Sequence, residues 1–266
     1  LMTTLKISSQ IRYWDQSPTR KISPRDRHGR TIEVAYFSLV QFTGLSKHYP
    51  LPLLYSYKTK KLYLPLREKF MSLERGTIYE VGDMTFEGEI PQVQKTVDAP
   101  MFYFVYNMAN YYHFIYDTLP YLFSYFNEKK IHPGMKLLVS PPEGQDDLYP
   151  FVWDSFNMLG ITRDDVVFLD SEVMYNHVCV SSSLTHNGLS NCPPHKGVFD
   201  ILNSMKSDYL GPEKIYISRR TWVHNKKDNI GTDYTERRRC MNEDQMVQIF
   251  KLYGFTEVFC ENLTME

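Results

Sequence analysis

The hydrophobic and polar positions change their period within residues 101–126, MFYFVYNMANYYHFIYDTLPYLFSYF. Residues 101–106 are apolar, aromatic and β-branched and lie between Pro100 and Asn107, which predicts a short buried strand. Further on, apolar residues recur at steps of three and four, as on one face of a helix, at Tyr111, Ile115, Leu119, Leu122 and Phe126. The stretch therefore predicts a strand that leads into a helix with one apolar face.

Downstream, strand-like and helix-like segments alternate. Strands are predicted at residues 135–140, 166–170, 178–183, 214–220 and 256–261. Helices are predicted at residues 146–160, 197–211 and 242–255. This alternation is typical of parallel strands joined by crossover helices. Sheets of this kind bind ligands at the carboxyl ends of their strands. The prolines of residues 190–197 indicate a hinge between two such units.

The first hundred residues follow a different pattern. Residues 1–30 are polar and basic in patches, which predicts an irregular arm, and residues 31–97 contain short β-type runs. We therefore expect an α/β protein with three regions. Residues 1–97 form the arm and a β-rich region, residues 98–196 a first Rossmann-like half, and residues 197–266 the incomplete start of a second half.

The charge of the chain is balanced. Its 266 residues contain 30 Lys plus Arg and 31 Asp plus Glu, a formal net charge of -1, so we expect no nucleic-acid partner and only local anion sites. Aromatic residues make up 15%, which suits sugar-stacking surfaces but is commoner in tyrosine-rich cores. The four cysteines have no C-x-x-C spacing, which disfavours a zinc knuckle or a redox pair.

The chain shows neither a signal peptide nor a transmembrane segment. This favours a cytoplasmic location. A secretory lumen, where the Asn262 sequon would matter, is the alternative if an N-terminal segment is missing.

His113 and Asp117 are the first candidate for chemistry. At positions i and i+4 of the predicted helix their side chains can touch, on a face separate from the apolar one. A carboxylate that accepts an imidazole N–H fixes the tautomer and makes the other ring nitrogen more basic, as a general base requires. Pro120 removes one hydrogen bond of the helix and is expected to free or kink that turn. A hydrogen bond without catalytic role is the alternative.

Arginines on both sides of a polar loop are the second candidate. They are Arg219, Arg220, Arg237, Arg238 and Arg239. Guanidinium groups at a strand end that faces a helix N-terminus can bind a diphosphate, and Asn242 as N-cap and Glu243 in the first turn suit that helix start. Solvation of the loop, or pairing with its acids, is the alternative.

Other motifs are weaker. His177, His186 and His195 lack the spacing of metal ligands and are interpreted as loop histidines, so we expect no metal site. The acids at residues 146–147 and 164–165 are interpreted as turn or helix-start acids. The chain contains no Walker, G-x-G-x-x-G or G-x-S-x-G motif, which disfavours P-loop, dinucleotide-binding and serine hydrolase functions.

Four ordered blocks carry a resemblance: NYYHFIYDTLPYL (residues 110–122), KIYISRR (214–220), RRCMNED (238–244) and GFTEVFCENLT (254–264). Together they resemble glycosyltransferase family 61. This family includes the extracellular O-linked N-acetylglucosamine transferase, the protein O-mannose β-1,4-N-acetylglucosaminyltransferase, and plant xylan xylosyl- and arabinosyltransferases.

The resemblance implies an α/β fold of the GT-B type, with an active cleft between two Rossmann-like halves. It also implies inverting transfer from a nucleotide sugar, such as UDP-GlcNAc or UDP-xylose, to a glycan or glycoprotein hydroxyl, without an obligatory metal or other cofactor. His113 and Asp117 match the H-x-x-x-D motif of the acceptor-side half. The residues that match the donor diphosphate blocks are Arg219, Arg238, Arg239, Asn242 and Glu243.

The family pattern continues into a His-Gly-Ala motif, whereas this sequence ends at Glu266. We therefore expect a C-terminally truncated chain. A non-catalytic glycan- or nucleotide-binding remnant of such an enzyme is the alternative function, and a metal-dependent hydrolase is disfavoured by its scattered ligands.

Overall fold

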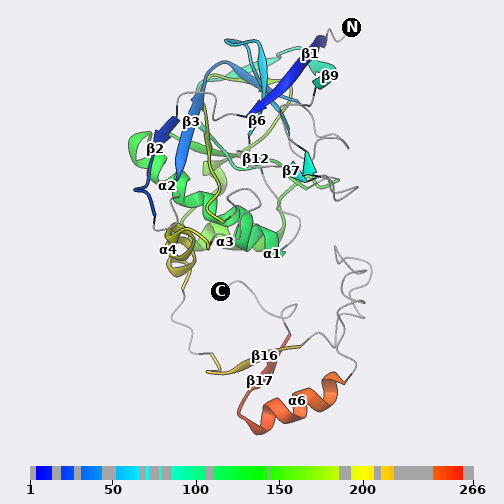
Figure 1. The fold of residues 1–266 in the computed structure, drawn as a ribbon, viewed down its shortest axis with the longest axis vertical. Helices are drawn as coiled ribbons and strands as arrows, with labels where there is room; N and C mark the ends of the chain where they lie inside the picture. The colour runs from blue at the N-terminus through cyan, green and yellow to red at the C-terminus, as the bar shows by residue number, and fades with distance from the viewer. Residues whose placement is uncertain are drawn as a thin grey trace.

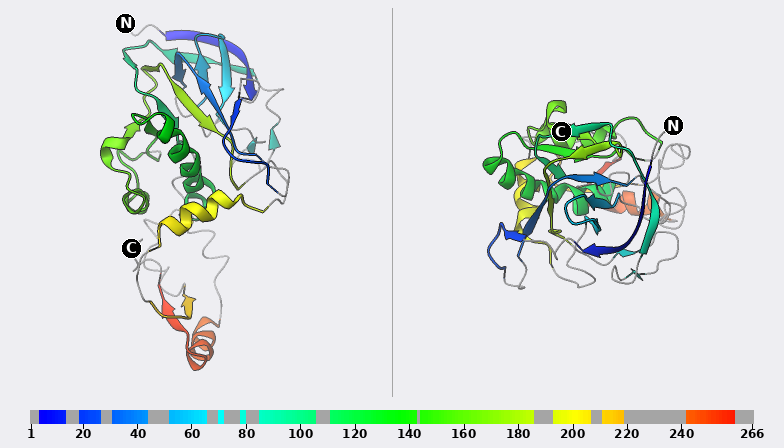
Figure 2. Two further views of the ribbon diagram at one scale, coloured as in Figure 1. Left: turned by 90° about the vertical axis from the view of Figure 1, so that its left-hand side faces the viewer. Right: turned by 90° about the horizontal axis from the view of Figure 1, so that it is seen from above.

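The structure is a computed structural model that describes residues 4–13, 19–26, 31–43, 52–65, 70–71, 78–79, 85–105, 111–142, 144–185, 193–206, 211–218 and 242–259. It is a mixed α/β protein, as the sequence predicts (Figure 1). Two large sheets and the helices beside them form one part, and a small βαβ unit near the C-terminus forms another (Figures 1 and 2).

The six-stranded sheet contains the predicted parallel strands. Its order is β13 (Val166–Phe168), β12 (Lys136–Val139), β11 (Met101–Tyr103), β15 (Val178–Ser181), β3 (Glu33–Phe37) and β2 (Thr19–Lys21). The first four of these strands are parallel, whereas β3 and β2 extend the sheet in antiparallel fashion. The alternating pattern of the sequence therefore predicts the parallel core correctly.

The seven-stranded sheet draws on distant parts of the chain. Its order is β10 (Lys95–Val97), β14 (Val173–Tyr175), β4 (Val40–Phe42), β5 (Leu54–Ser56), β6 (Lys61–Leu64), β1 (Thr4–Tyr13) and β9 (Thr85–Pro91). Strand β14, which the sequence analysis missed, pairs with β10 and β4. Two short strands, β7 (Phe70–Met71) and β8 (Ile78–Tyr79), pair with each other.

Helices cover one face of the six-stranded sheet, and the seven-stranded sheet packs on the other. The helices are α2 (Leu122–Ile131), α3 (Pro150–Met158) and α4 (Lys196–Ser204) (Figure 2). Strand β11 is buried on both faces: Phe102 lies in the core with the helices, whereas Met101 and Tyr103 lie in the core between the sheets. A central strand that is apolar throughout is the expected result of burial on both sides.

The irregular arm expected for residues 1–30 is wrong where β1 and β2 form. The segment TLKISSQIRY alternates apolar and polar residues, which is a strand pattern that its polar and basic composition obscures. Strand β1 pairs with β9 and β6, and β2 pairs with β3. The N-terminal β-rich region thus shares both large sheets with residues 98–196.

A buried carboxylate joins the N-terminal strands to α2. Glu128 is fully buried, and its two oxygens accept hydrogen bonds from Arg20 on β2 and Tyr36 on β3. Burial, together with the nearby Cys179 and Glu128, raises the pKa of Tyr36 above its ordinary value. Cys179 lies at the same place as a free, buried thiol, and burial raises its pKa as well. This cluster is part of the packing between α2 and the sheet.

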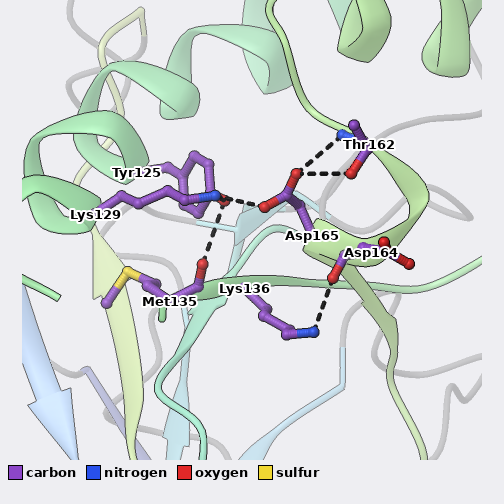
Figure 3. A network of polar contacts seen from close by, with 7 residues as sticks. All are labelled: Tyr125, Lys129, Met135, Lys136, Thr162, Asp164 and Asp165. Atoms are coloured by element: carbon purple, nitrogen blue, oxygen red, sulfur yellow. Dashed lines mark hydrogen bonds and ion pairs between the residues drawn. The ribbon is translucent and has the colours of Figure 1, made fainter. Parts of the chain in front are cut away.

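A second polar network, near the same end of α2, fixes this helix to the β12–β13 connection (Figure 3). Lys129 donates to the Tyr125 hydroxyl and to Asp165. Asp165 is the last residue of a 3-10 turn, η5 (Arg163–Asp165), that directly precedes β13. Asp165 also accepts from the backbone and hydroxyl of Thr162, which completes a capping box. The acid at residue 165 is therefore a turn acid, as predicted.

The C-terminal unit consists of β16 (Ile215–Ile217), α6 (Glu243–Leu252) and β17 (Thr256–Val258). Strands β16 and β17 are parallel, which confirms the predicted βαβ pattern. The ring of Tyr216 stacks on Phe250 of α6, with 4.8 Å between the ring centroids. This contact packs the helix on its own two-stranded sheet.

Candidate functional site

The strand order places a topological switch point between β11 and β15. The chain runs from β11 to β12 and β13 on one side of the sheet, and β15 then lies on the other side of β11. In open α/β sheets, ligands bind at such a point, outside the carboxyl ends of the parallel strands. The segments that follow β11 and β15 are therefore where a site is expected, and both carry polar residues.

The helix after β11 is irregular at this point. It begins as α1 (Tyr111–His113), widens into a π-helix, η3 (Phe114–Thr118), tightens into a 3-10 turn, η4 (Leu119–Tyr121), and continues as α2. The Leu119 N–H donates to the Phe114 carbonyl, five residues back. Pro120 has no N–H to donate, and the change of helix type is centred on it. Short π-helical turns are frequent at functional sites.

The buried face of this helix differs from the predicted apolar face. Of the five residues predicted for that face, Leu119 and Leu122 are buried, whereas Tyr111 is 53% exposed and Ile115 and Phe126 are half-buried. The buried face instead runs through Phe114, Thr118, Tyr121, Tyr125 and Glu128. The wider turn rotates the following residues relative to a regular helix, so the face that packs on the sheet is shifted.

His113 and Asp117 are in contact, as predicted. Their Nδ1 and Oδ2 atoms lie 2.6 Å apart, and their side chains are 46% and 18% exposed. Because a carboxylate accepts hydrogen bonds, Nδ1 is the donor and Nε2 is the basic nitrogen of the imidazole. At this exposure the pair contributes little to stability. Its effect is to fix the ring orientation and the tautomer.

The segment after β15 supports Asp117 from the other side of the switch point. The Thr185 hydroxyl donates to Asp117 Oδ1 over a long 3.5 Å, and the backbone N–H of Thr185 donates to the Ser183 hydroxyl at 3.2 Å. Thr185 and Ser183 are both buried. The sequence analysis missed these two residues. The run of hydroxyl residues that ends the predicted strand at residues 178–183 is the signal that points to them.

The second candidate site is described only in part. Arg219, Arg238 and Arg239 lie outside the described residues. Asn242 occupies the N-cap position of α6, as predicted, but its side chain makes no capping hydrogen bond. Glu243 is buried, and its Oε1 accepts from the hydroxyls of Tyr216, at 3.2 Å, and Ser218, at 3.0 Å. This carboxylate thus bonds to the end of β16, in addition to its place in the first turn.

The remaining candidates have structural roles. Asp147 accepts from Arg163 and from the Trp153 indole, and the hydrogen bond from Arg163 lowers the pKa of Asp147. His195, interpreted as a loop histidine, is instead a buried N-cap of α4 whose Nδ1 accepts from the Gly197 N–H. A Cβ at Gly197 would approach the Phe123 ring to 2.8 Å, so this close contact requires glycine.

The search for metal ligands covers the described part of the chain. No group of three or more His, Cys, Asp or Glu side chains is gathered there in a way that could hold a metal ion. His186 lies outside the described residues. Among the helices that the structure describes, none combines the length and the apolar character needed to cross a membrane.

Comparison of the chain with protein-family models, curated protein sequences and solved structures gives no match. The resemblance to glycosyltransferase family 61 therefore stays a prediction that rests on the four sequence blocks. The structure contributes an oriented His–Asp pair beside the switch point between the parallel strands β11 and β15.

Proposed function

We propose that the protein is an inverting glycosyltransferase that uses a nucleotide-diphosphate sugar and needs no metal. The observation that carries the proposal is the His113–Asp117 contact of 2.6 Å beside the carboxyl ends of β11 and β15. This location is where α/β sheets bind ligands, and the fixed tautomer leaves Nε2 as the basic atom. The block resemblance supplies the reaction class.

The reaction assigns each group one role. The acceptor hydroxyl oxygen attacks the anomeric carbon, its proton passes to His113 Nε2, and the bond from the anomeric carbon to the diphosphate oxygen breaks. The nucleoside diphosphate leaves with the electron pair. Asp117 stabilises the imidazolium that forms, as the carboxylate of a catalytic triad does. Arg219, Arg238 and Arg239 would stabilise the leaving diphosphate in place of a metal ion.

The proposed architecture is of the GT-B type. Residues 98–196 form the acceptor-side half; of the residues 197–266 predicted for the donor-side half, α4 packs on the acceptor-side half, so the start of the donor-side half lies after α4. Two observations support it. The parallel strands of the six-stranded sheet form one unit, and β16, α6 and β17 form a separate parallel βαβ unit. Donor and acceptor would then meet between the two units.

The test is to replace His113 by Ala and to measure sugar transfer and nucleotide-sugar binding separately. We expect turnover to fall about 10²- to 10⁴-fold, the usual contribution of a general base, while nucleotide-sugar binding stays unchanged. His177→Ala is the matched control, because His177 is an exposed histidine outside the site. Unchanged turnover of His113→Ala would remove the base assignment. Nucleotide-sugar binding without any turnover by the wild type would favour the non-catalytic binding protein.

A further inference from the structure

Three tyrosines lie on the helix beside the His–Asp pair, and we call them the tyrosine platform: Tyr111, Tyr112 and Tyr116. Tyr111 and Tyr112 are exposed, and Tyr116 is partly buried. Tyr112 is 63% exposed, and its ring centroid lies 5.3 Å from that of His113. Exposed aromatic surface costs hydrophobic free energy, and where it is gathered in one place it marks binding sites. The mechanism described above does not use these rings.

Contacts with other aromatic rings order the platform. The rings of Tyr112 and Tyr116 stack, with centroids 5.8 Å apart and planes 16° apart. Tyr111 meets the edge of Phe151 on α3, and Phe151 in turn contacts the buried Phe114. The contacts of Tyr111 connect the platform to the core on which the helices pack. A surface that is ordered before binding loses little conformational entropy when a ligand arrives.

The chemistry of the platform selects its ligand. Flat tyrosine rings suit a ligand that has an apolar flat face and polar edges, since tyrosine is apolar in its ring and polar at its hydroxyl. The Asp117 carboxylate beside the platform repels a diphosphate, and it can accept hydrogen bonds from neutral hydroxyl groups. A pyranose with equatorial hydroxyls meets both requirements, because its C–H bonds gather on its faces and its hydroxyls on its edges.

We propose that the tyrosine platform is the acceptor subsite and that it binds a neutral pyranosyl unit with equatorial hydroxyls, stacked on Tyr112 with one hydroxyl directed to His113. The assignment of the platform as an acceptor site rests on the proposed glycosyltransferase function. Sugar binding by the platform does not depend on that function. The acceptor would then be a glycan, and not the hydroxyl of a bare peptide.

The test is a binding experiment on the full chain. Soluble xylo-, cello- and chito-oligosaccharides and a serine- and threonine-containing peptide are the probes, and binding is followed by saturation-transfer NMR and calorimetry. We expect at least one oligosaccharide to bind, and Tyr112→Ala to weaken its binding about tenfold, the scale of one lost stacking contact. Tyr112→Phe keeps the ring and should retain most of the affinity.

Two controls separate the explanations. Tyr253→Ala removes another exposed tyrosine, at the end of α6, and should leave oligosaccharide binding unchanged. Because Tyr112 is mostly exposed, Tyr112→Ala should also keep the melting temperature of the wild type. UDP binding, measured in parallel, should be the same in wild type and Tyr112→Ala.

Four outcomes would overturn the inference: no oligosaccharide binds to the wild type, Tyr112→Ala binds as tightly as the wild type, the peptide binds through Tyr112 in place of the sugars, or UDP binding is lost with the ring. Failure of the proposed function is seen in a separate assay. If Tyr112-dependent oligosaccharide binding is found but no nucleotide sugar is turned over, the platform stands as a glycan-binding surface and the transferase proposal fails.

Discussion

His113–Asp117 and Glu243 are polar groups at corresponding places in the two parts of the molecule, since each lies at the start of a helix that follows a parallel strand. They differ in what their hydrogen bonds do. The His113 side chain is nearly half exposed and is bonded to a carboxylate that orients it. Glu243 is buried, and its carboxylate joins α6 to Tyr216 and Ser218 of the preceding strand segment.

The comparison shows that an acid near the start of a helix that follows a strand is an ambiguous signal. Such an acid can face a ligand, where the helix dipole favours anions and polar groups, or it can bond back to its own strand. Burial and hydrogen-bond partners decide between the two. The described contacts leave His113 partly exposed and oriented by Asp117, and they bond Glu243 to its own strand segment.

Among the changes that test this comparison, Asp117→Asn has the largest expected effect. An amide can present its N–H₂ to Nδ1 and so select the wrong histidine tautomer, and in catalytic triads the corresponding change is very costly. We expect kcat to fall about hundredfold or more, with the binding of nucleotide sugar unchanged. Steady-state kinetics and calorimetry on the full chain measure the two quantities.

Asp154→Asn is the matched control, because Asp154 lies on α3 and outside the pair. A normal kcat for Asp117→Asn would mean that the contact is only a surface hydrogen bond, the alternative that the sequence leaves open. The difference between the two regions would then disappear, because both acids would be structural.

The second prediction concerns Glu243→Ala. Removal of the carboxylate removes its hydrogen bonds with the hydroxyls of Tyr216 and Ser218, and a hydrogen bond to a charged group contributes about 1.5–3 kcal/mol. We expect faster hydrogen–deuterium exchange in β16 and α6 and a smaller change in the six-stranded sheet. Glu243→Gln, which keeps one acceptor oxygen, should have a milder effect.

Asp244→Ala is the control for Glu243, since Asp244 is an exposed acid in the same turn of α6. If Glu243→Ala abolished nucleotide binding and left hydrogen exchange unchanged, Glu243 would be a ligand-binding group. The two regions would then be alike in function, in line with the role that the resemblance gives to Glu243.

The sequence predicts those features that depend on local pattern. The parallel strands β11, β12, β13 and β15 follow from short apolar runs between helices, and the i, i+4 spacing alone brings His113 and Asp117 together. The predictions fail where long-range contacts decide. The pairing of β14 with β4 is one case, since its partner lies more than a hundred residues away.

In the candidate site, too, the features that the sequence does not predict depend on long-range contacts. Thr185 reaches Asp117 across 68 residues of sequence, and only the sheet order brings the two segments together. The π-helical turn is a second case, because Pro120 indicates a disturbed helix but not its type, and the type determines which face is buried. The alternation in β1 was present in the sequence but was masked by its polar composition.

The smallest expected effect tests whether the first half also contains a purely structural acid, Asp165. Burial acts to raise the pKa of Asp165, but the hydrogen bonds from Lys129 and Thr162 outweigh it and hold the pKa below its ordinary value (Figure 3). A carboxyl with a lowered folded-state pKa binds fewer protons in the folded state. Its stabilisation is therefore fully present above the ordinary pKa of 3.8 and is lost as the pH falls through the folded-state value.

Asp165→Asn should accordingly lower the free energy of unfolding at pH 7 by about 1 kcal/mol, measured by urea denaturation. The difference from the wild type should shrink as the pH is lowered below 3.8, because the wild-type carboxyl then becomes protonated. Asp164→Asn is the control, since Lys136 bonds to the backbone carbonyl of Asp164 and not to its side chain. Sugar transfer should be unaffected at any pH where the variant is folded. If the difference in free energy of unfolding persisted unchanged at low pH, the charge of Asp165 would contribute nothing to stability.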